Sequence, residues 1–189
     1  IMEMGFLGYK MRPALGPEED LRTVELMRKT CGGEMDIMID AHTWWRMGNK
    51  SYQPETIAEL SRSMSAYQPY WLEEPLPPED HEAYKELRDR RYLAIASGEH
   101  EQDLAGFESL AGLRAVDFLQ MDVCCQGGFS MGSRIFQAIE RATLKFAFHS
   151  WGNNLEVLAA AHLGICWPED VVEWLEFPCY ANKGRAGMY

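Results

Sequence analysis

Three short apolar segments of the sequence each end in a carboxylate and are each followed by a helical pattern. They are residues 37–40, 70–73 and 93–99, which end at Asp40, Glu73 and Glu99. The acids are 33 and 26 positions apart, about the length of one βα unit. Because the C-terminal ends of parallel strands lie on one face of a sheet, we expect the three carboxylates to converge. Converging carboxylates repel one another unless a cation lies between them, and an all-oxygen site suits Mg²⁺.

The remainder of the chain continues this alternation of strand and helix. The pattern predicts strands over residues 5–12, 37–40, 70–73, 93–97, 116–121, 145–148 and 171–175. Helices are expected from Pro17 to a stop at Cys31, and over residues 54–66, 81–90, 103–110, 130–143 and 153–165. Each strand carries a polar or ionisable residue at its C-terminal end, which favours a (β/α) barrel. A doubly wound open sheet is the competing architecture, but it would concentrate its site at one switch point.

The predicted fold class is therefore α/β, a TIM-type (β/α)7β barrel. Such a barrel needs roughly 200 to 250 residues, and this chain has 189 residues and shows seven strands. We expect residues 1–189 to form a single, incomplete barrel domain, in which the first βα unit and an N-terminal capping domain are not seen.

Composition excludes several classes of protein. Apolar residues make up 47% and charged residues 25%, which is typical of a globular chain. The net charge of -11 argues against nucleic acid and anionic membranes as partners. No apolar run approaches membrane-spanning length. Five cysteines without CxxC spacing indicate free thiols and a cytoplasmic location; they are Cys31, Cys124, Cys125, Cys166 and Cys179.

Seven separated motifs together resemble the enolase superfamily, and within it the mandelate racemase subgroup. In chain order they are Lys10-Met11-Arg12, Asp40-Ala41-His42, Leu72-Glu73-Glu74-Pro75, Gly98-Glu99-His100, Asp122 ahead of Gly127-Gly128, His149, and Trp174-Leu175-Glu176. A single one of these motifs, such as Glu-Glu-Pro, would be weak, but their order and spacing agree over almost the whole chain.

The resemblance implies a role for each motif. Asp40, Glu73 and Glu99 would ligate Mg²⁺, and Asp122 and His149 would form a general-base dyad. Lys10 and Arg12 would face the dyad across the site, and Glu176 would lie near the carboxylate of a small-molecule substrate. The step shared by the family is removal of the proton α to a carboxylate, giving an enediolate that the metal stabilises. The family also tends to form symmetric assemblies, so a homo-oligomer is expected.

Two residues favour dehydration of a sugar acid over racemisation. Arg12 stands where racemases often carry a second Lys base, and a guanidinium holds its proton too tightly for that task. His42 stands where some acid-sugar dehydratases carry a general acid, although it could equally cap or pack beside Trp44. Trp44 itself could line the substrate pocket or pack in the core. A racemase or epimerase on the same scaffold, and an incomplete barrel that binds metal without turnover, are the alternatives.

Overall fold

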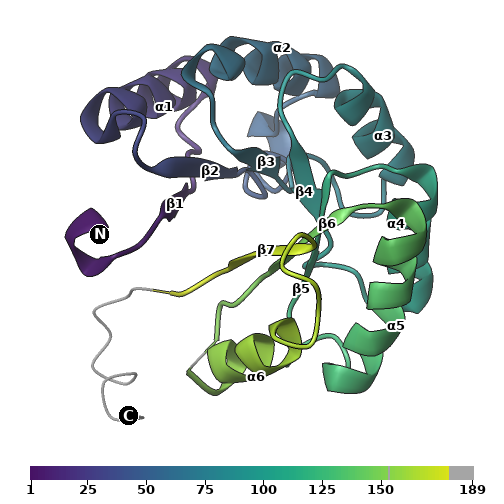
Figure 1. Ribbon diagram of the computed structural model, residues 1–189. Helices are drawn as coiled ribbons and strands as arrows, with labels where there is room; N and C mark the ends of the chain where they lie inside the picture. Colours follow the sequence, from purple (N-terminus) through teal and green to yellow (C-terminus); the bar gives the residue numbers. More distant parts are fainter. Residues whose placement is uncertain (153, 179–189) are drawn as a thin grey trace. The chain divides into compact units, whose positions relative to one another are not determined.

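The computed structural model describes residues 1–152 and 154–178, and strands alternate with helices along the chain (Figure 1). The chain divides into two compact units, residues 1–96 and 97–189. In the first unit the elements are η1 (Met2–Met4), β1 (Gly8–Met11), α1 (Pro17–Cys31), β2 (Asp36–Asp40), η2 (Gly48–Lys50), α2 (Pro54–Met64), η3 (Ser65–Tyr67), β3 (Trp71–Glu73) and α3 (His81–Asp89). β4 (Ile95–Ser97) lies at the boundary.

Local sequence signals explain where the helices of the first unit begin and end. α1 starts at Pro17, whose fixed φ suits the first helical position, and three acids in its first turn complement the helix dipole. Gly32, with a φ of 65°, ends α1. α3 is capped by Asp80, whose carboxylate accepts the Ala83 N–H at 3.2 Å.

The strands of the first unit are parallel and follow the order of the chain. β1 pairs with β2, β2 with β3 and β3 with β4. The register places Asp40 opposite Glu73, and Glu73 opposite Ala96. The strand order shows no reversal within this unit, as in a (β/α) barrel and unlike the switch point of a doubly wound sheet.

The second unit continues with α4 (Leu104–Leu113), β5 (Phe118–Met121), α5 (Gly128–Ala142), β6 (Lys145–Phe148), α6 (Asn154–Gly164) and β7 (Val172–Leu175). β5, β6 and β7 are parallel, and Met121, Phe148 and Leu175 are partners across them. The next residue of each strand is Asp122, His149 or Glu176. These three polar residues therefore lie at the same level, just beyond the C-terminal ends of their strands.

Each unit has its own apolar core. In the first unit Ile37, Ile39 and Leu72 are fully buried, and in the second Phe107, Leu119 and Phe146 are. The Trp167 ring lies 4.7 Å from that of Phe146 and 5.6 Å from that of Phe148. Burying a large apolar side chain contributes about 1.5–3 kcal/mol to the free energy of folding. The buried strand residues that alternate with the site residues therefore stabilise the sheet.

The alternation confirms the predicted α/β class and agrees with an incomplete (β/α) barrel. β1 is shorter than the predicted 5–12 segment, and α5 begins at Gly128 rather than Ser130. Gly127, with a φ of 90°, is the N-cap of α5, and Gly128 is its first residue, so the helix starts within the glycine pair and two residues earlier than predicted. The predicted start of the last helix at Asn153 lies outside the described residues. Among the described residues, none of the helices is both long and apolar enough to cross a bilayer.

Candidate active site

Asp40 and Glu73 are buried next to each other at the ends of β2 and β3. They are partners in the parallel register, and 1% and 0% of their side chains are exposed. Oε2 of Glu73 accepts the indole N–H of Trp71 at 2.9 Å. Two carboxylates in one buried location are stable only when cations or donors compensate their charge.

Lys10 and Arg12 supply that compensation from β1 and the residue after it. The Lys10 ammonium lies 2.7 Å from Oε1 of Glu73 and 3.9 Å from Oδ2 of Asp40. The Arg12 guanidinium donates to Oδ2 of Asp40 from Nε at 3.0 Å and from Nη2 at 2.5 Å. Both side chains therefore point to the same face, as the period-two spacing predicts.

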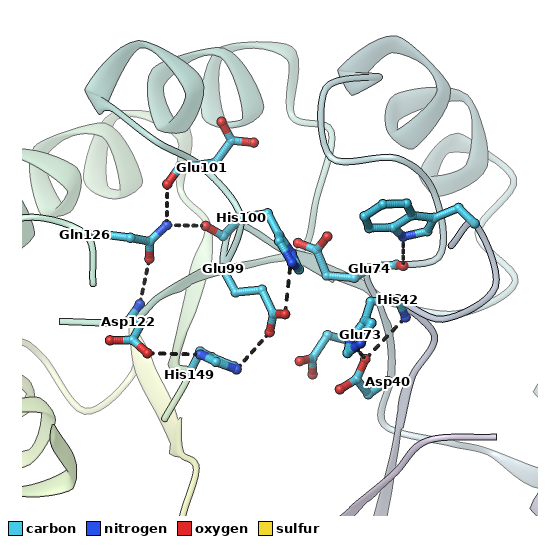
Figure 2. Close-up of polar contacts among 12 residues, drawn as sticks. Asp40, His42, Glu73, Glu74, Glu99, His100, Glu101, Asp122, Gln126 and His149 are labelled. Carbon is cyan, nitrogen blue, oxygen red and sulfur yellow. Dashed lines mark hydrogen bonds and ion pairs between the residues drawn. The ribbon is translucent and has the colours of Figure 1, made fainter. Parts of the chain in front are cut away.

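His42 adds a further contact to Asp40. Its Nδ1 lies 3.0 Å from Oδ1 of Asp40, and its backbone N–H donates to the same oxygen at 3.3 Å (Figure 2). Burial raises the pKa of Asp40, but the hydrogen bond from His42 and the charges of Lys10 and Arg12 outweigh burial and hold the pKa well below its usual range. Asp40 is therefore an anion at neutral pH, as a metal ligand must be.

Near Asp40 and Glu73, two tryptophan indoles donate hydrogen bonds to backbone carbonyls. Glu74 is fully buried with a φ of 48°, and its backbone carbonyl accepts the indole N–H of Trp45 at 3.0 Å. Trp44 is also fully buried, and its indole N–H donates to the carbonyl of Pro13 at 2.8 Å. Of the two readings that the sequence leaves open for Trp44, burial favours core packing over a place in the substrate pocket.

In the second unit, His149 lies among three carboxylates. Its Nε2 is 2.9 Å from Oε2 of Glu99, and its Nδ1 is 3.4 Å from Oδ2 of Asp122 (Figure 2). Nε2 also lies 3.8 Å from Oε2 of Glu176. Glu176 also accepts the backbone N–H of Ser150 at 3.1 Å. Nδ1 of His100 lies 3.4 Å from Oε1 of Glu99. The histidine and its three acids come from four separate strand ends, as the sequence pattern predicts.

Backbone donors hold Asp122 as an anion. Its Oδ1 accepts the N–H groups of Cys124 and Cys125, both at 3.0 Å. Burial raises the pKa of Asp122, but hydrogen bonds from His149, Glu156 and the Cys125 N–H outweigh it and hold the pKa well below its usual range. An anionic carboxylate at Nδ1 keeps the proton on that nitrogen and increases the basicity of Nε2.

Two buried neighbours of Asp122 were not identified from the sequence. Glu156, in the first turn of α6, is buried and hydrogen-bonds to Asp122. Gln126 binds Asp122 through its side-chain amide. Glu156 looks like an ordinary first-turn acid of a helix, and a glutamine before a glycine pair looks like a loop residue, so neither pattern separates them from surface positions.

The pKa values of the adjacent thiols Cys124 and Cys125 are both raised. Burial, followed by the charge of Asp122, raises the pKa of Cys125 to about 11, and burial also raises the pKa of Cys124. Thiols with raised pKa values are poor nucleophiles at neutral pH. Cys31, Cys124, Cys125 and Cys166 are free thiols, as expected, and Cys179 lies outside the described residues.

Asp40 and Glu73 of the first unit fit a hard divalent cation. They offer buried, paired oxygen atoms at one level of the sheet. Carboxylate oxygens are the donors that Mg²⁺ selects.

Comparison with known proteins identifies relatives along the whole chain. The profile of the family described as Enolase C-terminal domain-like matches residues 1–185, which confirms the resemblance seen in the motifs. D-galactarolactone cycloisomerase of Agrobacterium fabrum is 31% identical over 156 residues, which cover 82% of this chain and 39% of the relative.

Solved structures agree with this match. The 3,6-anhydro-D-galactonate cycloisomerase of Zobellia galactanivorans is 30% identical, with a TM-score of 0.85 over 98% of this chain and 50% of its own. L-talarate dehydratase of Polaromonas sp. JS666, solved with Mg and L-glucarate, is 28% identical, with a TM-score of 0.80 over 94% of this chain and 46% of its own. The chain thus spans about half the length of these relatives, or less.

Proposed function

The chain belongs to the Enolase C-terminal domain-like family, and we propose that it forms the catalytic barrel portion of a Mg²⁺-dependent acid-sugar dehydratase. This enzyme would remove the α-proton of a sugar-acid carboxylate and expel the β-hydroxyl as water. The observation that carries the proposal is His149, whose two ring nitrogens face Asp122 and Glu99 at 3.4 and 2.9 Å. A base with an orienting carboxylate on one side and a candidate metal ligand on the other suits proton removal next to a metal-bound carboxylate.

We assign Asp40, Glu73 and Glu99 as the residues that hold Mg²⁺. The buried carboxylates of Asp40 and Glu73, the low pKa of Asp40, and Mg in the solved L-talarate dehydratase support the assignment. Bound Mg²⁺ would stabilise the negative charge that develops on the substrate carboxylate. Lys10 and Arg12, which neutralise the same carboxylates here, would also offset the charge of the substrate.

His149 and His42 take the two proton-transfer roles. Nε2 of His149 would accept the α-proton, and Asp122 would stabilise the imidazolium through Nδ1. As electrons move to the β-carbon and its C–O bond breaks, His42 would give a proton to the departing oxygen. Its contact with Asp40 at 3.0 Å holds the ring in one orientation. Glu176 would contact the substrate near its carboxylate end.

A cycloisomerase is the second candidate. Two relatives at 31% and 30% identity carry that name. If the oxygen on the β-carbon belongs to a ring, the same proton removal and C–O cleavage open the ring and lose no water. The racemase alternative is weaker because Arg12, held by Asp40, replaces a second base. The homo-oligomeric state and the cytoplasmic location stay predictions.

The experiment is a screen of sugar acids, their lactones and their anhydro forms with Mg²⁺. Mass spectrometry distinguishes the reactions, because a dehydratase product is lighter by one water and a cycloisomerase product is an isomer. His149→Asn should lower turnover by at least about 10³-fold, since the base is lost. His42→Asn should block loss of the β-oxygen and keep exchange of the α-proton in D₂O.

The histidines on two helices provide matched controls. His81→Asn and His162→Asn remove an imidazole from α3 and α6 and should leave turnover near the wild-type rate. Wild-type protein that neither converts an acid nor exchanges its α-proton would contradict the proposal. Full turnover by His149→Asn would contradict the assignment of the base.

A further inference from the structure

The side-chain amide of Gln126 joins two loops of the second unit. Its Oε1 accepts the backbone N–H of Asp122 at 2.7 Å, and its Nε2 donates to the carbonyls of Gly98 and Glu101 at 2.7 and 2.6 Å (Figure 2). Gln126 is 8% exposed. Both amide hydrogens and the amide oxygen are therefore used on backbone groups, in a location that water hardly reaches.

The loop on one side of this amide carries Glu99. Gly98 and Glu101 flank Glu99 and His100, and the Glu101 N–H donates to the Gly98 carbonyl at 3.0 Å, which closes the turn. Gln126 binds both ends of that turn. The turn cannot rotate or shift against the end of β5 without breaking at least one of these hydrogen bonds.

The segment on the other side of the amide carries Asp122, and through it His149. Asp122 contacts Nδ1 of His149 at 3.4 Å, and Nε2 of His149 contacts Glu99 at 2.9 Å. The contacts thus close a ring from Glu99 through His149, Asp122 and Gln126 back to Gly98 (Figure 2). A ring of this kind couples the position of the candidate metal ligand to the position of the base.

Other side chains of similar size cannot make the same set of bonds. Glutamate could accept the Asp122 N–H, but its second oxygen would face two carbonyl oxygens. Methionine keeps the volume and loses all three hydrogen bonds, which leaves buried backbone groups unsatisfied. Asparagine keeps the donors and the acceptor, but it is one methylene shorter.

We propose that Gln126 is a positioning residue that sets the distance between Glu99 and the Asp122–His149 dyad. The inference rests on the proposed function, because it takes Glu99 as a metal ligand and His149 as the base. Side chains that orient metal ligands typically change metal affinity or activity 10- to 100-fold when they are replaced. Gln126 acts through Glu99 and Asp122 and needs no contact with substrate.

The experiment measures Mg²⁺ affinity by calorimetry for the wild type, Gln126→Met and Gln126→Asn, with Gln102→Met as the control. Gln102 is exposed in the same loop, and its Nε2 donates to the carbonyl of His100 at 2.9 Å. We expect both Gln126 variants to bind Mg²⁺ more weakly, with a Kd raised by about 10-fold or more. Gln102→Met should bind Mg²⁺ like the wild type. On an acid that the wild type converts, kcat should fall more than KM changes.

The outcomes separate this inference from the proposed function. A purely structural role would lower the urea midpoint of the Gln126 variants and leave the Mg²⁺ Kd and kcat of the folded protein at wild-type values, which would overturn the inference alone. Wild-type protein that does not bind Mg²⁺ would overturn the proposed function and this inference with it. Gln126→Asn covers the case in which Gln126→Met does not fold, since it keeps the polar group.

Discussion

Asp122 and Glu156 show how their surroundings give neighbouring carboxyl groups different charges. Asp122 accepts two backbone N–H groups and stays an anion. Burial, followed by the hydrogen bond to Asp122 and its charge, raises the pKa of Glu156 to about 7. The pair therefore holds one proton near neutral pH, and Glu156 can donate it to the anion that orients His149.

Glu156→Gln should make the stability of the protein less sensitive to pH. The folded chain binds the Glu156 proton more tightly than the unfolded chain, in which the pKa is about 4.3. The stability from this group is thus fully present below about pH 4.3 and is lost as pH rises through about 7. Glutamine keeps a donor to Asp122 and cannot ionise. Thermal unfolding from pH 5 to pH 8 should therefore show a smaller fall in Tm for Glu156→Gln than for the wild type.

Glu140→Gln is the matched control, because Glu140 is exposed on α5. It should follow the wild-type pH profile. The other titratable groups near Glu156, which are Asp122, His149, Cys124 and Cys125, are the same in the wild type and both variants. An identical fall in Tm for the wild type and Glu156→Gln would show that Glu156 is not protonated in the folded protein.

At the scale of secondary structure, the strand ends were the most predictable part of the chain. Short apolar runs precede Asp40, Glu73 and His149, and each run ends at a polar residue. In the structure, Asp40 and Glu73 are the last residues of their strands, and His149 directly follows its strand. The sequence alone therefore predicts the strand-end acids and the histidine.

Contacts made by irregular segments could not be read in the same way. Gln126 binds carbonyls 25 and 28 positions away, and no local periodicity encodes such a pairing. The burial of Trp44 depends on its hydrogen bond to Pro13 and its ring contact with Tyr52, at 5.3 Å between centroids. Tertiary packing decides these positions, and residue type alone leaves core and pocket equally open.

The end of β4 provides a test at the same scale. Gly98 has a φ of 133°, and a Cβ atom there would lie 2.3 Å from the carbonyl oxygen of Gln120. Gly98→Ala should therefore destabilise the protein by about 2–5 kcal/mol, through backbone strain and overpacking against β5. Urea unfolding measures the change.

Gly112→Ala is the control with the opposite sign. Gly112 lies in α4, and a Cβ atom there would meet nothing within 4 Å. Alanine should stabilise this helix by about 0.5–1 kcal/mol. Gly98→Ala with wild-type stability would mean that the chain leaves β4 along a different path.

For the whole molecule, the proposed metal links folding to function. The chain has a net charge of -11, and two of its carboxylates, Asp40 and Glu73, are buried in the candidate metal site. Lys10 and Arg12 compensate those carboxylates in the structure, so the fold does not depend on metal to neutralise them. We therefore expect the protein to fold without Mg²⁺ and to gain stability when it binds.

Mg²⁺ at about 100 times its Kd should stabilise the protein by about 2.7 kcal/mol, which corresponds to a rise in Tm of about 5–10 °C. NaCl at matched ionic strength controls for screening of the negative charge, and EDTA should reverse the rise. Asp40→Asn should lower the starting Tm because Arg12 loses a charged partner, so the Mg²⁺-specific shift is the quantity to compare. That shift should vanish in Asp40→Asn and persist in Asp170→Asn, which changes an exposed acid. An equal rise in Tm with NaCl would show that Mg²⁺ acts by screening the surface charge. An equal Mg²⁺-specific rise in Tm for Asp40→Asn would exclude Asp40 as a ligand.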